Sequence, residues 1–527
     1  MTPPEAAGFG AALALASRSV ALVLHRRWFR QGFVGDSSVH WAIVRTLRSR
    51  PRARWIDEYV ISPEPMSYPT GFHRFAALFP LGLVRSSQWL PNLLLWTAGI
   101  AGFAAYSDLA ARPLLHVPAN AVLLSLAFLL LVPTALVFQG PAIAYLKLSE
   151  RLLGRFATGF VVLLLTVGTL AQDTSSLVGA AVVVAVALVS SIFSRQALVM
   201  GLPLLALAWW DWRPLAVLVG GTVLALLLAR ERFVEGVRHT WLQISRIYPQ
   251  LTKSSKHVTP VLSSFAGPAE LLRLVRTPTE LRAALLGREP SRALIMYPEL
   301  VVLIVLLAAS GEGHAWHWGA PVATFGLLYL ATSTARLNHL GEAYRYLEFG
   351  LFLLAPLEIA ILVRTWPTWA KIALLLGLAT WSVALLTRLV LRGAWLRELP
   401  DRDMLGEFLA GLSLVSGDVV FPVAMRLGAD VCARLEGVRS FWWQPGIVAE
   451  PIYEEFIEEY PYLKREFRPL FDRYGVTHVV CDKAALERLD WSYDFSALAP
   501  AAENEHYVAF VVPRAAASEQ VLEEQQA

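Results

Sequence analysis

The sequence predicts an α-helical polytopic membrane protein of about eleven transmembrane helices and one interfacial half-helix, followed by a small C-terminal α/β soluble domain. Two observations support this prediction. The chain of 527 residues is 56% hydrophobic and 17% charged, with a mean hydropathy of +0.49, which is too apolar for a soluble protein of this length. Apolar runs of roughly 20 residues, the length that crosses a hydrocarbon core, also recur along most of the chain.

The predicted membrane domain covers residues 1–392 and contains two long hydrophilic outer loops, 25–88 and 230–296. Apolar runs alternate with polar breaks throughout this part, and each run predicts a helix. The predicted spans are 8–24, 89–110, 119–138, 156–171, 176–193, 197–210, 214–229, 297–310, 318–334, 348–364 and 368–389.

Residues 393–513 differ in pattern and predict the soluble domain. Short apolar runs at 419–421, 476–480 and 507–512 are typical of buried strands, and helices are expected at 452–460 and through Phe467 and Tyr474. Strands that alternate with helices predict a small α/β domain. Residues 514–527 are rich in Ala, Glu and Gln and predict a disordered tail. Cys432 and Cys481 both lie in the soluble domain, and their number does not decide whether they pair.

The segment from Ser67 to Val84 is too short and too polar at its start to span a membrane well, so it predicts the interfacial half-helix. The N-terminus is expected in the cytoplasm. The periplasmic side then receives loops 25–88, 139–155, 230–296 and 335–347 and the tail. This topology predicts an integral protein of the bacterial inner (plasma) membrane, with its C-terminal domain on the periplasmic, outer side.

The distribution of basic residues agrees with this orientation only in part. Four basic residues, Arg112, Arg213, Arg364 and Lys371, lie in short loops that the topology places in the cytoplasm, as the positive-inside rule requires. Three others, Arg26, Arg27 and Arg30, follow the first span on the outer side and oppose the rule.

Three short motifs lie where the predicted loops meet the membrane. Asp36 follows the first span, Tyr68-Pro69 leads into the half-helix, and Glu150 ends the next outer loop. In these motifs the sequence resembles the GT-C superfamily of membrane glycosyltransferases, and it is similar to the protein mannosyltransferase and aminoarabinose transferase-like families. The resemblance implies transfer of a sugar from a polyprenyl-phosphate carrier at the outer membrane face. The chain has Thr70 where many members have a second proline.

Inverting glycosyl transfer requires a carboxylate that takes a proton from the acceptor hydroxyl, or orients it, and cations that hold the departing phosphate. Asp36, just beyond a span, fits the base, and Glu150 is the second candidate catalytic acid. Both residues also allow a structural role. Asp36 could cap a helix that begins at Ser37, and Glu150 could cap the following helix and favour its dipole.

A dense polar cluster at 338–348 directly precedes an apolar run and supplies candidate substrate-binding residues. Arg345 is the candidate for binding the carrier phosphate. Tyr346 is the candidate for contact with the sugar or the interface, and Glu342 belongs to the same cluster. The alternative is an anchor of Tyr and Arg at the level of the lipid head groups.

The start of the half-helix adds Tyr68, His73 and Arg74 to the candidate binding residues. A cation at this position could contact a lipid phosphate. Interfacial snorkelling of the long side chain is the alternative.

The absence of a Walker A loop, a zinc signature, a nucleophile elbow and a dinucleotide fingerprint argues against a nucleotide-driven pump and a soluble-type hydrolase. The sequence predicts a membrane glycosyltransferase acting on an envelope glycan, lipid or protein. Its expected partners are a polyprenyl-phosphate-linked sugar and membrane lipids, without nucleic acid. No cofactor is certain, and a divalent metal ion stays open. The alternatives are a transporter or flippase of lipid-linked saccharide and a non-catalytic membrane assembly subunit.

Overall fold

The computed structural model describes residues 3–24, 36–53, 69–116, 118–131, 148–242, 244–245, 297–310, 315–332, 337–341, 343–392, 403–423, 427–441, 468–483, 486, 495 and 498–513. The chain divides into two compact units. Unit 1 comprises Met1–Arg26 and Pro69–Glu398, and unit 2 comprises Arg27–Tyr68 and Leu399–Ala527.

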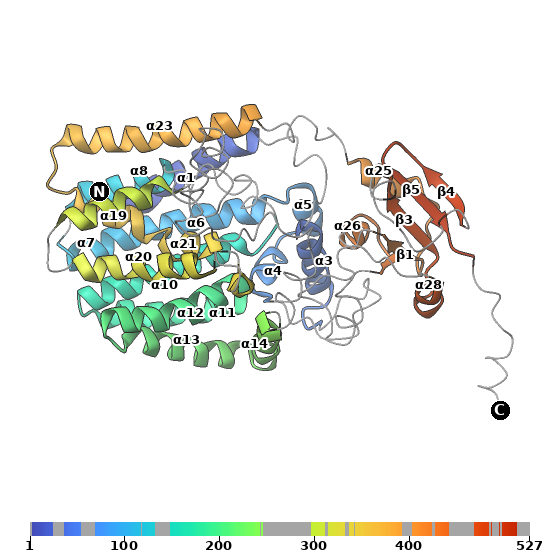
Figure 1. Cartoon of the computed structure of the whole chain (residues 1–527), viewed down its shortest axis with the longest axis horizontal. Coiled ribbons are helices and arrows are strands. Elements are labelled where there is room, and N and C mark those ends of the chain that lie inside the picture. Colours follow the sequence, from blue (N-terminus) through green and yellow to red (C-terminus); the bar gives the residue numbers. More distant parts are fainter. Residues whose placement is uncertain are drawn as a thin grey trace, which may run out of the picture. The chain divides into compact units, whose positions relative to one another are not determined.

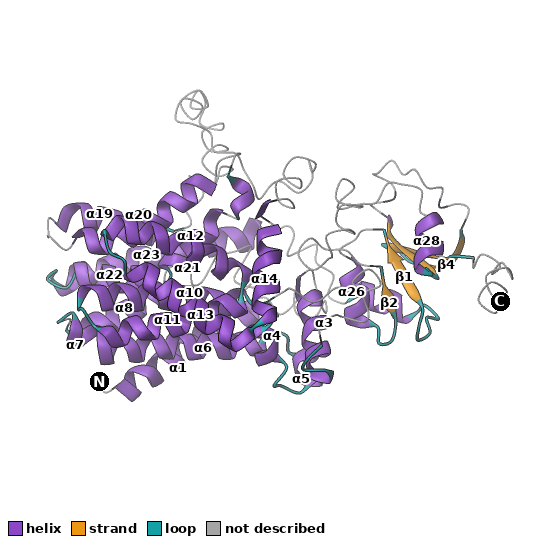
Figure 2. Cartoon of the chain, turned by 90° about the horizontal axis from the view of Figure 1, so that it is seen from below, coloured by secondary structure: helices purple, strands orange, loops and turns teal. Residues whose placement is uncertain are grey.

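Unit 1 is a bundle whose long helices run side by side (Figures 1 and 2). Each predicted apolar run contains a helix. The helices of unit 1 are α1 (Pro3–Leu24), α4 (Gly71–Ala76), α5 (Leu81–Ser86), α6 (Leu90–Tyr106), α7 (Arg112–Leu114), α8 (Ala119–Leu131), α10 (Arg151–Leu170), α11 (Thr174–Ser190), α12 (Ile192–Trp209), α13 (Arg213–Ala229), α14 (Glu231–Leu242), α19 (Pro298–Ser310), α20 (Ala315–Thr332), α21 (Ala343–Leu351), α22 (Leu354–Leu362) and α23 (Thr368–Arg392), with a π-helical turn at Ser107–Ala111 and a 3-10 turn at Asn338–Leu340.

Among the described helices, three are long and apolar enough to cross a membrane by themselves: Leu90–Leu114, Arg151–Ala171 and Ile192–Trp209. The pair α13 and α14 meets the same criteria only together, and it is bent by 119°. The apolar character of the predicted runs is therefore confirmed, and the number of complete crossings stays a prediction.

Helix α10 lies at the centre of the bundle and packs against α6, α11, α12 and α21. Its Phe156 ring contacts Trp96 of α6 and Phe352 beside α21, with centroids 5.7 and 5.3 Å away. Close packing of this kind, rather than the hydrophobic effect, holds helices together inside a bilayer.

Helices α13 and α23 expose apolar side chains. In α13, Leu227 and Leu228 are 67% and 73% exposed, and in α23 Trp369 is 73% exposed. A soluble bundle would carry polar residues on such outer faces. The chain is therefore an integral membrane protein, and the described helices that are long and apolar enough to cross a membrane lie in unit 1.

The segment predicted as one half-helix forms two helices of six residues each, α4 and α5. Pro80 lies between them at the N-cap of α5. A helix of six residues is only about 9 Å long. Neither piece crosses a membrane, and the single half-helix of the prediction is corrected to a broken pair.

The predicted span 348–364 is also broken, into α21 and α22. Pro356 lies in the first turn of α22. Because proline has no N–H and its ring clashes with the carbonyl four residues earlier, it interrupts the helix at Phe352.

Unit 2 contains a five-stranded sheet with the order β2-β1-β3-β5-β4. Its elements are α3 (Asp36–Ser49), α25 (Met404–Ala410), β1 (Val419–Pro422), α26 (Leu427–Arg434), β2 (Arg439–Ser440), α28 (Arg468–Tyr474), β3 (His478–Asp482), β4 (Ala499–Glu503) and β5 (Tyr507–Val511). Strand β1 pairs in parallel with β2 and β3, and β5 pairs antiparallel with β3 and β4. The three predicted strands correspond to β1, β3 and β5, so the predicted small sheet is confirmed.

The two outer strands of this sheet are irregular. Strand β2 has only two residues, and β4 shifts register against β5 between Pro500 and Ala502. Cys432 and Cys481 are both buried in unit 2 and do not form a disulfide. The predicted helix at 452–460 and the tail 514–527 lie outside the described residues.

Candidate functional site

Residues 190–196, which we call the 190–196 turn, run from the last residue of α11 into the first turn of α12, and most of their side chains are buried and polar. Ser191 caps α12 by accepting a hydrogen bond from the Ser194 backbone N–H. A Cβ atom at Gly154, in the first turn of α10, would lie 2.6 Å from the hydroxyl oxygens of Ser191 and Ser194. Only glycine therefore allows α10 to approach this turn so closely.

Three other segments contact the same turn. Gly71 at the start of α4 packs on Ser190, and Gly341 packs on Gln196. Arg195 contacts α14. The segments at 69–76, 148–154, 231–242 and 337–346 therefore lie at one end of the bundle, which we call the polar end.

Arg195 attaches α14 to this end. Its guanidinium donates to the Leu188 carbonyl and, at 3.5 Å, to the Thr240 hydroxyl. A Cβ atom at Gly236 would lie 2.6 Å from Arg195 Nη1, so glycine at this position leaves room for the guanidinium in its present place. On the outward side of α14, Val237 is an exposed apolar residue. Helix α14 thus has one face packed on the bundle and an apolar flank left open.

The structure buries most of the candidate residues at the polar end. Glu150 is 1% exposed at the N-cap of α10, and its side chain makes no capping hydrogen bond to that helix. His73 is fully buried in α4, so interfacial snorkelling is wrong for it. Arg74 is exposed, and its Nε donates to the Thr70 hydroxyl at 3.4 Å.

Arg345 and Tyr346 of α21 are both buried in the protein. The Arg345 guanidinium carbon lies 3.3 Å from the centre of the Phe193 ring, in a cation–π contact. The Tyr346 hydroxyl donates to the Leu340 carbonyl at 2.7 Å. Their burial argues against the alternative, an anchor of Tyr and Arg at the level of the lipid head groups.

A cluster of buried charged residues lies between α10 and α21. Arg155 of α10 is fully buried, and its Nη1 lies 3.6 Å from Oε1 of Glu348 in α21. The guanidinium also stacks at 3.7 Å over the Phe352 ring. Tyr297 and Glu299 line the same pocket as Glu348. Charges buried in an apolar bundle mark a functional site by default, because stability alone does not favour them.

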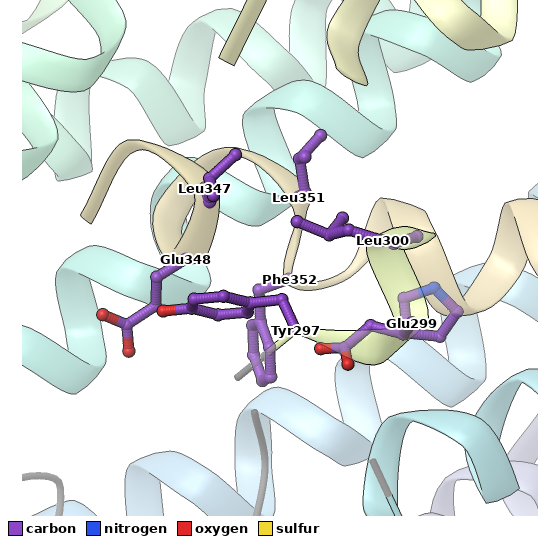
Figure 3. Close-up of a pocket in the computed structure, with 9 residues that line it drawn as sticks. Tyr297, Glu299, Leu300, Leu347, Glu348, Leu351 and Phe352 are labelled. Carbon is purple, nitrogen blue, oxygen red and sulfur yellow. The ribbon is translucent and has the colours of Figure 1, made fainter. Parts of the chain in front are cut away.

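A small pocket, with room for about one water molecule, lies beside this cluster. Figure 3 shows the Tyr297 ring extending toward Glu348, with Glu299 on the other side. The break between α21 and α22 forms part of the wall. The pocket is lined by Tyr297, Glu299, Leu300, Leu347, Glu348, Leu351, Phe352, Ala355 and Pro356.

Sequence reasoning did not select Arg155, Glu299, Tyr297 or the 190–196 turn. Arg155 falls just outside the predicted span 156–171, although it lies inside α10 and is fully buried. A lone arginine inside an apolar helix is a signal that could have identified it.

Asp36 is the first residue of α3, in unit 2, whereas Glu150 and Arg345 belong to unit 1. Whether the three residues converge on one site stays a prediction. Tyr68 and Glu342 lie outside the described residues. Within the described part of the chain, no group of three or more His, Cys, Asp or Glu side chains could hold a metal ion.

No family model matches the sequence, and no curated protein matches it. Among solved structures, the chain is similar to the crystal structure of the Archaeoglobus fulgidus oligosaccharyltransferase tethered through a disulfide bond to an acceptor peptide that contains the NVT sequon. The two chains are 10% identical, and the match covers 90% of this chain and 69% of that chain, with a TM-score of 0.49.

Proposed function

We propose that the chain is a membrane glycosyltransferase of the GT-C type, which transfers a sugar from a polyprenyl-phosphate-linked donor to an envelope glycan, lipid or protein. The observation that carries the proposal is the buried cluster of Arg155, Glu348 and Glu299 beside a pocket in unit 1. A polar substrate group that reaches this cluster would account for charges that an apolar bundle otherwise disfavours. The motifs at Asp36, Tyr68-Pro69 and Glu150 add the resemblance to the superfamily.

In the proposed reaction the acceptor hydroxyl attacks the anomeric carbon of the donor sugar. The bond between this carbon and the phosphate oxygen breaks, and the carrier phosphate leaves with the electron pair. The hydroxyl proton passes to the carboxylate of Asp36, with Glu150 as the second acid. Arg345 binds the phosphate, and His73, Arg74, Tyr68, Tyr346 and Glu342 contribute to donor binding.

The variant Asp36→Asn tests this function. Asparagine caps a helix about as well as aspartate, so the variant keeps any capping role and loses the base. With purified protein in lipid vesicles and a polyprenyl-phosphate sugar as donor, we expect no transfer and a thermal stability near wild type. The variant Asp472→Asn, at a half-exposed surface ion pair, is the control. Full activity of Asp36→Asn would leave Asp36 only as a cap.

The proposal includes a fixed orientation, with the C-terminal domain on the outer side of the bacterial inner membrane. A reporter enzyme that works only after export, fused behind Ala527, is expected to be active. A reporter that is active only in the cytoplasm should be silent in the same position. The reverse pattern would place the domain inside and contradict the outer-face reaction.

One observation favours the transporter alternative. The α21–α22 helix is interrupted beside the pocket, and substrate sites of transporters are commonly built at broken helices. Vesicles that contain fluorescent lipid-linked saccharide, assayed with and without an acceptor, separate the two functions. Translocation without any need for acceptor would favour the transporter, whereas transfer without translocation supports the enzyme.

A further inference from the structure

Helix α3, which begins at Asp36, packs on helix α26 of the C-terminal α/β domain. The Ser38 hydroxyl donates a hydrogen bond to Oδ1 of Asp430. Seven residues further along α3, Arg45 donates from Nη2 to the Cys432 carbonyl at 3.1 Å. Residues seven apart lie on the same face of a helix. Two hydrogen bonds, about 10 Å apart along the axis, therefore attach one face of α3 to α26.

Helix α26 is itself part of the domain core. Its Leu427 and Val431 are buried in one hydrophobic cluster with Val420 of β1 and Val480 of β3. A helix held in this way moves with the sheet rather than independently of it. The position of α3 is thus tied to the C-terminal domain, although more than 350 residues of sequence separate Ser38 from Asp430.

Asp430 is held in place from its other side. Arg434, one turn later in α26, lies with Nη1 3.5 Å from Asp430 Oδ1. The same guanidinium binds Asp403 through two hydrogen bonds of 2.9 Å. Because Arg434 keeps its bidentate partner Asp403, a change at Asp430 leaves no unpaired buried cation. Arg434 therefore keeps a charged partner when Asp430 is altered.

We propose that Asp430 is a positioning residue for sugar transfer: the C-terminal domain, through the hydrogen bond from Ser38 to Asp430, holds the start of α3 and thereby sets the position of Asp36. The proposal rests on the proposed role of Asp36 as the base. The contact between α3 and α26 would then be needed for the reaction, because a catalytic group must be held within about 0.5 Å and 10–20° of its productive geometry.

The first test measures the docking of α3 without reference to activity. Amide hydrogen exchange of residues 36–49 is followed in the full-length protein in lipid. In Asp430→Ala and in Ser38→Ala, exchange of these amides is expected to rise about ten- to a hundredfold. In Asp430→Asn it should stay near wild type, since the amide oxygen still accepts from Ser38. The matched control, Asp472→Asn in the same domain, should show no change. Unchanged exchange in both alanine variants would overturn the docking role.

The second test asks whether the effect reaches the chemistry through Asp36. We expect Asp430→Ala to lower kcat at least tenfold with little change in KM for the lipid donor. Asp430→Asn should keep most of the wild-type kcat. Combined with Asp36→Asn, Asp430→Ala should cause no further loss beyond that of Asp36→Asn, because residues that act through one group are not additive.

The outcomes separate this proposal from the proposed function. Faster exchange with wild-type kcat in Asp430→Ala would refute the positioning role and leave the enzyme proposal intact. A further loss in the double variant would also refute it, because Asp430 would then act by another route. Full transfer by Asp36→Asn would instead remove the base, and the proposed function would fail together with the inference that rests on it.

Discussion

Breaking the Arg155–Glu348 ion pair from one side is expected to destabilise the bundle more than removing both charges together. The two charged atoms lie 3.6 Å apart, and the side chains are 0% and 2% exposed. At an effective dielectric constant of about 20, Coulomb's law gives an attraction of roughly 4–5 kcal/mol at this distance. Loss of one partner of a buried pair typically costs about 3–5 kcal/mol, so the two figures agree.

The variants Arg155→Met, Glu348→Leu and their combination form a double-mutant cycle. Each single change should lower the unfolding midpoint by roughly 6–10 °C in a thermal melt in detergent, at about 2 °C per kcal/mol for a large chain. The double variant should recover most of this loss, since no uncompensated charge stays buried. Arg468→Met, at a half-exposed ion pair with Asp472, should change stability by less than about 1 kcal/mol.

The same cycle separates stability from function. If the cluster binds the polar part of the substrate, the double variant is stable and inactive in sugar transfer. A double variant that is stable and transfers sugar at the wild-type rate would refute the functional reading of the pocket. Single variants no less stable than Arg468→Met would refute the calculation itself.

Three further predictions concern other regions. Arg345→Lys should lower the rate of sugar transfer roughly a hundredfold or more, because lysine lacks the planar guanidinium group and cannot stack on the Phe193 ring. A wild-type rate across a titration of lipid donor would contradict this. A spin label at Val237 of α14 should be accessible to oxygen in the lipid, and one at Glu235, on the opposite side of the helix, to a water-soluble nickel complex; equal accessibility would remove the interfacial helix. Burial lowers the pKa of His478 in the folded domain. When the pH falls below the ordinary histidine pKa of about 6.5, the unfolded domain therefore binds a proton more readily than the folded one. The stability of the domain then falls as the pH drops. The protection factors of the β3 amides, which correct for the pH dependence of intrinsic exchange, should therefore fall toward acid pH in wild type and less so in His478→Gln.

The apolar runs predicted most of the helices of unit 1 because hydrophobic length is imposed by the bilayer and is visible in sequence. The break at Pro356 was not predicted, since proline is tolerated in membrane helices when neighbours satisfy the exposed carbonyls. The strands β1, β3 and β5 were predicted from their continuous apolar runs. Strand β4 was missed because Ala499–Glu503 has no β-branched or aromatic residue.

The site was less predictable than the fold. Asp36, Glu150 and Arg345 were selected as polar residues next to apolar runs, which is a local signal. The contacts among Arg155, Glu348 and Glu299 join helices that are far apart in sequence, and only packing brings them together. The docking of α3 on α26 was missed for the same reason, since nothing near Ser38 in the sequence indicates Asp430.

The irregular outer strands of the sheet in unit 2 bear on how copies of this protein meet in a crowded membrane. An added strand needs a regular row of backbone donors and acceptors on the edge that it joins. Strand β2 offers two residues, and β4 contains Pro500, which has no N–H, beside its shifted register. Neither edge is a template for growth by strand addition, so neighbouring copies are protected from polymerising through their sheets. Any complex between copies is expected to form through helical surfaces.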